Sequence, residues 1–151
     1  MSIKFKSSAK TAYGRLGEIK RLILAEPLGY DQNVYRIEKS DLYYLNYTFP
    51  KCNTICCVAG WEITLAHSER RVKEIAKVYD CAETAQKDLG LTLDQSKELF
   101  EPSALSKLAQ HKGEVLPKPQ TLQYAKLGYE HITNFQHKYA KQLKAFKLKG
   151  R

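Results

Sequence analysis

Four cysteines offer the first candidate for chemistry in this chain. Cys52, Cys56 and Cys57 fall within six positions, and Cys81 follows at a distance. The thiolates of Cys52, Cys57 and Cys81 and the imidazole of His67 could in principle surround a zinc ion, because structural zinc sites take four such ligands in a tetrahedron. The spacing differs from that of paired zinc knuckles, and adjacent helical cysteines point about 100° apart. Buried free thiols are therefore the favoured interpretation, and we expect no metal and no other cofactor.

A reactive thiol is the second possibility, and Cys57 is its candidate. A cysteine in the first turn of a helix has its thiolate stabilised by unpaired N–H groups and by the helix dipole. The neighbours of Cys57 are apolar, however, and desolvation raises the pKa of a thiol. The four histidines match no nucleophile motif and no zinc-hydrolase spacing, and the eight glycines form no phosphate-binding loop. We predict no catalytic residue and expect a protein that is not an enzyme, with a thiol- or metal-dependent enzyme as an alternative.

The strongest functional pattern is positive charge at the two ends of the chain. Residues 1–24 hold six basic side chains against one acid, and residues 119–151 hold seven against one, so the ends carry more than the net charge of +9. Lysines neutralise phosphates and release counterions, which predicts salt-sensitive binding of nucleic acid or another polyanion. The alternative is a solubilising helix end with a frayed tail. The predicted contacts are Lys4, Lys6, Lys10, Lys138, Lys141, Lys144, Lys147, Lys149 and Arg151.

Helices must position most of these residues. Apolar side chains recur every three or four residues over 9–25, which predicts an amphipathic helix that ends before Pro27. Residues 54–67 are apolar nearly all round, which predicts a central helix buried by its neighbours, with Thr54 as its N-cap. We expect five residues of this region to build the structural core: Cys52, Thr54, Cys57, Gly60 and Trp61.

The segment between these two helices is rich in tyrosine. Aromatic and β-branched residues favour extended structure, so a short β-hairpin is possible around residues 34–49, and an ordered loop fits equally well. Tyrosine supplies large contact areas at low entropic cost. The candidate protein interface is therefore Tyr35, Tyr43, Tyr44 and Tyr47, with half-buried packing on the helices as the alternative.

The remaining helices are indicated by their stop and start signals. Gly90 predicts the end of one helix and Thr92 the cap of the next, whose inward residues we expect to be Leu93, Ser96, Leu99 and Phe100. A further turn or two fits residues 103–110, and residues 111–118 are the best candidate for a mobile loop. The last helix is predicted to run from Pro119 to about Phe146 and to be the longest.

These patterns together predict a mainly α protein. We expect one compact helical domain over residues 1–151, with flexible basic ends at about 1–8 and 147–151. No run of about eighteen apolar residues is present, and the N-terminus lacks the pattern of a secretory signal. The sequence therefore predicts no membrane partner and a cytoplasmic location.

One motif resembles a known family. Residues 52–60 read C-N-T-I-C-C-V-A-G, which resembles the C-G-T-x-x-C-x-A-G motif of small proteins from bacteria and their phages. The L-G-L-T stretch at 89–92 and the L-F-E-P stretch at 99–102 match as well, so the resemblance spans roughly residues 10–140. Asn53 replaces the usual Gly, and Asn is the next best residue for a left-handed turn. The resemblance implies that Cys52 and Cys57 lie at the centre of the fold.

The resemblance also implies a biological context, because such proteins are accessory cargo of phages and mobile elements that bind host factors or nucleic acid. It carries no catalytic residue to this chain. Our first hypothesis is a non-enzymatic accessory protein that binds nucleic acid through both basic ends, in the cytoplasm of a bacterial host. The second is an inhibitor or adaptor that binds an acidic or nucleic-acid-binding host protein, for example in a defence complex.

Overall fold

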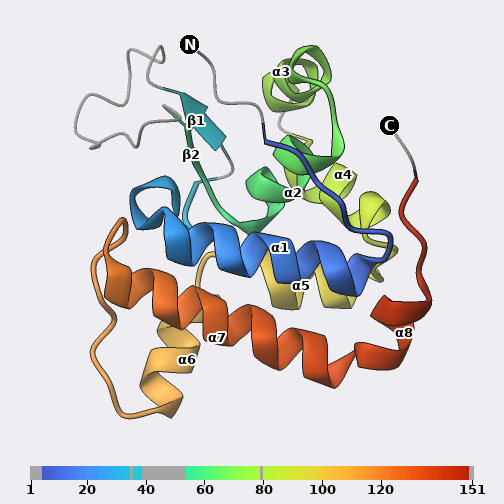
Figure 1. Cartoon of the computed structure of the whole chain (residues 1–151). Coiled ribbons are helices and arrows are strands. Elements are labelled where there is room, and N and C mark those ends of the chain that lie inside the picture. Colours follow the sequence, from blue (N-terminus) through green and yellow to red (C-terminus); the bar gives the residue numbers. More distant parts are fainter. Residues whose placement is uncertain (1–4, 35, 39–53, 79, 150–151) are drawn as a thin grey trace.

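The fold is seen in a computed structural model that describes residues 5–34, 36–38, 54–78 and 80–149 (Figure 1). The described residues are mainly helical, as the sequence predicts, and they pack around one core. The helices are α1 Ala12–Ala25, α2 Val58–Ala66, α3 Glu69–Lys77, α4 Cys81–Asp88, α5 Leu93–Phe100, α6 Ala104–His111, α7 Leu122–Lys138 and α8 Ala140–Ala145. A 3-10 turn at Pro27–Gly29 and the strands β1 Arg36–Glu38 and β2 Thr54–Cys56 complete the described elements.

Helix α1 confirms the first predicted helix, although it begins three residues later than its pattern. Thr11 is the cap, because its hydroxyl accepts a hydrogen bond from the backbone N–H of Gly14 at 3.1 Å. Leu16, Ile19 and Ile23 are fully buried on one side of the helix. The helix therefore supplies one wall of the core and leaves its other side to polar residues.

Helix α2 is the buried central helix that its composition predicts. Residues 58–63 are all buried, and Trp61 donates its indole N–H to the carbonyl of Gly29 at 3.0 Å. The predicted start at Thr54 is wrong, since Thr54 lies in β2 and the helix begins at Val58. Cys57 takes the N-cap position with an extended backbone (φ −78°, ψ −175°) and makes no side-chain cap. Three residues paired in a β-strand thus stand where the apolar pattern predicts the first turn of the helix.

The two strands form a short antiparallel pair. Arg36 is opposite Cys56, and Glu38 is opposite Thr54. The first strand lies inside the predicted hairpin region of 34–49, but the second lies beyond it. Five residues proposed for the interface or the core fall outside the described residues: Tyr35, Tyr43, Tyr44, Tyr47 and Cys52.

The signals between α4 and α5 are confirmed. Gly90 has a positive φ of 65°, which favours glycine over residues with a Cβ atom. A Cβ atom there would also lie 2.2 Å from the ring of Phe146, so there is no space for a side chain. Thr92 and Gln95 form a reciprocal capping box at the start of α5. Leu99 and Phe100 point inward as predicted, whereas Leu93 is 59% exposed and does not.

The last predicted helix is broken in two. α7 ends at Lys138, and Tyr139 leaves the helical conformation (φ −116°, ψ 24°) before α8 begins. The ring of Tyr139 packs against Phe135, with centroids 4.8 Å apart, and its hydroxyl donates to Glu98 on α5. The break turns the end of the chain toward the start of α1.

Helices α1 and α7 lie side by side and run in opposite directions (Figure 1). The ammonium of Lys20 on α1 donates a hydrogen bond to the hydroxyl of Thr133 on α7. At the start of α1, the carbonyl of Tyr13 accepts one from the amide of Gln136, near the end of α7. α8 contacts the start of α1, where Lys144 lies over the ring of Tyr13. In the part of the chain that the structure describes, no helix is both long and apolar enough to cross a membrane.

Candidate functional site

The two ends of the chain are joined by backbone hydrogen bonds. The N–H of Ala12 donates to the carbonyl of Phe146 at 3.1 Å, and the N–H of Leu148 donates to the carbonyl of Lys10 at 3.0 Å. Thr11 and Lys147 form the antiparallel bridge between them. Because these bonds fix the two backbones side by side, the segment around Lys10 adjoins the segment around Lys147. Residues 5–8 and 147–149, from the ends predicted to be flexible, thus make contacts with the rest of the fold.

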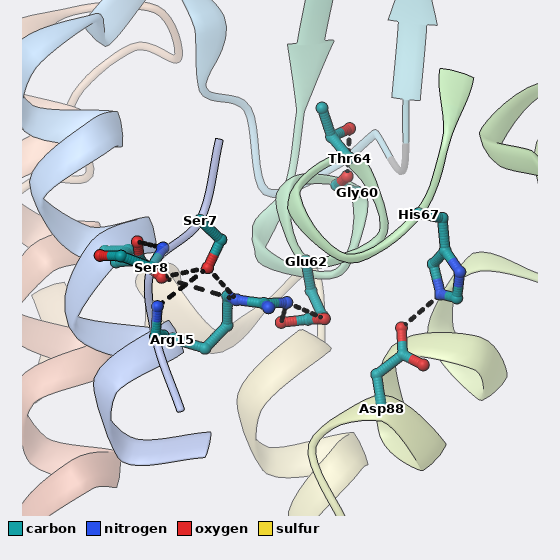
Figure 2. Close-up of polar contacts among 10 residues, drawn as sticks. Ser7, Ser8, Arg15, Gly60, Glu62, Thr64, His67 and Asp88 are labelled. Atoms are coloured by element: carbon teal, nitrogen blue, oxygen red, sulfur yellow. Dashed lines mark hydrogen bonds and ion pairs between the residues drawn. The ribbon is translucent and has the colours of Figure 1, made fainter. Parts of the chain in front are cut away.

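A buried polar cluster holds the N-terminal segment in this position (Figure 2). The guanidinium of Arg15 on α1 contacts both carboxylate oxygens of Glu62 on α2, at 2.9 and 3.1 Å. Its Nε donates to the hydroxyl of Ser7 at 2.9 Å, and the backbone N–H of Ser8 donates to Glu18 at 3.0 Å. Arg15 therefore links the N-terminal segment, α1 and α2.

Burial dominates the chemistry of Glu62. Its side chain is fully buried, and desolvation raises its pKa to about 8, although Arg15 opposes the shift. Phe5 adds an apolar contact to the same region, with its ring edge-on to Trp61 at 5.1 Å between centroids. The cluster is a structural anchor for residues 5–11, and it was invisible in the sequence because its two main partners lie 47 positions apart.

Most of the predicted contact lysines are exposed at the joined ends. Six of them have no acidic partner at ion-pair distance among the described residues: Lys6, Lys10, Lys141, Lys144, Lys147 and Lys149. Lys138 differs, because its ammonium lies 2.8 Å from Glu98 and that pair raises its pKa. Its ammonium therefore has an acidic partner on α5, unlike those six lysines. Lys4 and Arg151 lie outside the described residues.

Two lysine–tyrosine contacts on the same face were not predicted. The ammonium of Lys144 lies 4.8 Å from the centre of the Tyr13 ring, and that of Lys20 lies 4.8 Å from the centre of the Tyr129 ring. Each contact joins α1 to the C-terminal helices. In the sequence these tyrosines only stand out as aromatic residues among lysines on the same helices. Which lysine each ring contacts depends on the antiparallel packing of the helices.

The described cysteines, Cys56, Cys57 and Cys81, are buried. Desolvation raises the pKa of the Cys57 thiol to about 12. A group of three His, Cys, Asp or Glu side chains able to hold a metal is absent from the described residues. Cys57 and Trp61 lie in the core with Gly60, as their motif predicts. The proposed zinc ligands cannot be tested as a set, because Cys52 lies outside the described residues.

Two histidines have structural partners. The Nε2 atom of His67, at the end of α2, lies 2.7 Å from a carboxylate oxygen of Asp88 on α4 (Figure 2). His131 lies 3.1 Å from the carbonyl of Leu99, and burial lowers its pKa, so its ring is neutral at neutral pH. Both contacts tie neighbouring helices together.

A separate hollow lies between α4 and α5. Its volume is about 530 Å³, and the exposed Leu93 and the ring of Phe100 contribute apolar surface beside Pro102. Glu83, Lys97 and Glu101 stand at the same hollow. This mixture of apolar and charged groups gives a second surface on which another molecule could bind.

Comparisons of the chain with protein-family models, with curated proteins and with solved structures found no significant match.

Proposed function

We propose that this chain is a non-enzymatic binding protein that contacts nucleic acid through the basic surface at its joined ends. The observation that carries the proposal is the pairing of residues 10–12 with residues 146–148, in which Lys147 lies opposite Thr11 and the backbone of Lys10 bonds to that of Leu148. Charges that gather on one surface attract phosphates more strongly than the same charges spread over the molecule.

The lack of acidic neighbours strengthens this proposal. Elsewhere in the described part of the chain, lysines on α3, α4 and α6 are paired with glutamates, as Lys87 is with Glu83 at 3.3 Å and Lys107 with Glu101 at 2.9 Å. Such pairs cancel charge locally and leave little net attraction for a polyanion. At the joined ends, by contrast, Lys10, Lys144 and Lys147 have no acidic partner within ion-pair distance among the described residues.

The experiment is a binding titration followed by fluorescence anisotropy at low salt, with labelled single-stranded and duplex DNA as separate probes. The test variant carries Lys10→Gln, Lys144→Gln and Lys147→Gln. The matched control carries Lys73→Gln, Lys87→Gln and Lys107→Gln, which removes the same number of charges from paired positions.

The proposal expects the test variant to bind at least roughly tenfold more weakly than the control. Absence of binding by the unmodified chain to either probe overturns the proposal. Equal losses in the two variants also overturn it, because only the net charge would then matter.

The wider context is part of the proposal. We infer a phage or mobile-element accessory protein acting in the cytoplasm of a bacterial host, on the resemblance of residues 52–60 to the C-G-T-x-x-C-x-A-G motif. Flanking genes would test this inference, since phage or defence genes beside the coding sequence support it and housekeeping genes contradict it.

An adaptor that binds a host protein is the second candidate, and the hollow between α4 and α5 favours it. Exposed Leu93 is the kind of apolar anchor that protein interfaces use. Capture of a host protein that survives nuclease treatment and is lost in a Leu93→Arg variant would support this function. Capture that disappears with nuclease would support nucleic-acid binding in its place.

A further inference from the structure

The line along which α1 packs against α7 and α8 carries a row of unpaired positive charges. We call its outer side the α1–α7 seam and define it by Tyr13, Arg21, Lys20, Tyr129 and Lys144. The three cations have no acidic partner within ion-pair distance among the residues that the structure describes. Burial and repulsion from Arg21 both lower the pKa of Lys20, which is what crowding of positive charge without a nearby anion produces.

Each end of the seam combines a cation with an aromatic ring. Lys144 lies over Tyr13 at one end, and Lys20 lies over Tyr129 at the other, where it also donates to the hydroxyl of Thr133 at 3.1 Å. Tyr13 and Lys20 are seven residues apart on α1, which corresponds to about 10 Å along the helix axis. The two ring sites therefore lie a few nucleotides apart at most.

A buried glycine, Gly17, lies at the middle of the seam. A Cβ atom at Gly17 would lie 3.3 Å from one terminal nitrogen of Arg21, so the guanidinium lies close against the helix backbone there. The Gln136 amide is beside it, at 3.7 Å from the same point, and donates to the carbonyl of Tyr13. The Oε1 atom of Gln136 is buried beneath the seam and has no hydrogen-bond partner among the described residues.

We propose that the α1–α7 seam binds a single strand of nucleic acid, with phosphates on Lys20, Arg21 and Lys144 and bases stacked on Tyr13 and Tyr129. This inference rests on the proposed function and adds the path and the strand type. Cations that alternate with aromatic rings are the arrangement that binds single strands, because the charges follow the backbone and every base has a face that stacks.

A duplex uses only half of this arrangement. Its bases are stacked on one another and are unavailable to the rings, so it would contact the lysines and the arginine alone. In the free protein each lysine ammonium covers its tyrosine ring. When a phosphate draws the ammonium aside, the ring face becomes available to the base next to that phosphate.

The test compares a short labelled oligothymidylate with a duplex of the same length in anisotropy titrations. Tyr13→Leu and Tyr129→Leu remove the rings, whereas Tyr13→Phe and Tyr129→Phe keep them. Thermal unfolding of each variant checks that the fold is retained, and both tyrosines are only partly buried. Each Leu variant is expected to bind the single strand at least about fivefold more weakly than its Phe counterpart. Duplex affinity should change less than about twofold.

The outcomes separate the two proposals. Preference for the single strand, together with loss in the Leu variants, supports the seam as the binding path. Equal affinity for both probes with no effect of the rings overturns this inference and leaves the proposed function standing. Failure of the unmodified chain to bind either probe overturns both.

Discussion

Replacing one member of the buried Arg15–Glu62 pair should destabilise the protein far more than replacing both. Glu62 is fully buried and Arg15 is 6% exposed, so neither can turn to water when its partner is lost. Breaking a buried pair costs about 3–5 kcal/mol, whereas apolar residues of similar volume in both places are often tolerated. The relevant variants are Glu62→Leu, Arg15→Met and the double variant.

The structure places the cost of Glu62→Leu near the lower end of that range. Arg15 would keep the hydroxyl of Ser7 at 2.9 Å and the carboxylate of Glu18 at 3.6 Å, which compensate part of the loss. We therefore expect about 3 kcal/mol for Glu62→Leu. The two changes should couple by about 2–3 kcal/mol in a double-mutant cycle.

Urea unfolding at about pH 9, above the raised pKa of Glu62, measures these quantities with both groups charged in the unmodified chain. At a slope of about 2 kcal/mol per molar urea, Glu62→Leu should move the midpoint down by about 1.5 M. Single variants within about 1 kcal/mol of the unmodified chain, with no coupling, would refute the assignment of this pair as the anchor of the N-terminal segment.

Three further predictions concern stability and reactivity. Burial raises the pKa of Glu62 in the folded state to about 8, so the stability that comes from its protonation is fully present below the unfolded pKa of about 4.5 and is lost as the pH rises through 8. The difference in unfolding free energy between the unmodified chain and Glu62→Gln should accordingly fall over that interval, and a constant difference would contradict the raised pKa. Gly128→Ala places a Cβ atom 2.4 Å from the buried ring of Tyr30. The overpacking cost of about 1–3 kcal/mol should exceed the gain of about 1 kcal/mol in helix propensity, so the variant should be less stable. An unchanged or raised melting temperature would count against this packing. Cys57, whose pKa burial raises to about 12, should react with a thiol reagent only on unfolding, and rapid labelling of its peptide at neutral pH, seen by mass spectrometry, would oppose the buried thiol.

The sequence predicts those elements whose signals are local. The Thr92 capping box and the Gly90 stop need only neighbouring residues, and both are present in the structure. The apolar spacing in α1 likewise reports its buried side. The exposed position of Leu93 shows the limit, because its inward placement was inferred from spacing near a helix start, where the neighbouring helix decides burial.

The errors arise where distant residues decide the backbone. Thr54 fits an N-cap in its local sequence, but pairing with Glu38 draws it into a strand. Tyr139 fits an uninterrupted helix, but α7 ends before it in the structure, where its hydroxyl donates to Glu98 on another helix. Neither partner is identifiable from spacing along the chain.

The candidate surface is predicted only in part, because distant residues also decide which of its charges are paired. Charge alone identifies the two lysine-rich ends, since it requires no knowledge of partners. It does not reveal that Lys138 is paired, because its partner Glu98 comes from another helix. The seam residues Lys20 and Tyr129 become a pair only when α1 and α7 are laid side by side.

The most direct measurement of the nucleic-acid proposal is the slope of log affinity against log salt concentration for a short single strand. Each phosphate contact contributes about 0.7 to the magnitude of that slope. Lys144→Gln is expected to reduce it by about 0.7, whereas Lys138→Gln, at the position paired with Glu98, should leave it unchanged. A slope near zero for the unmodified chain, or equal reductions in the two variants, would contradict binding through unopposed lysines at the joined ends.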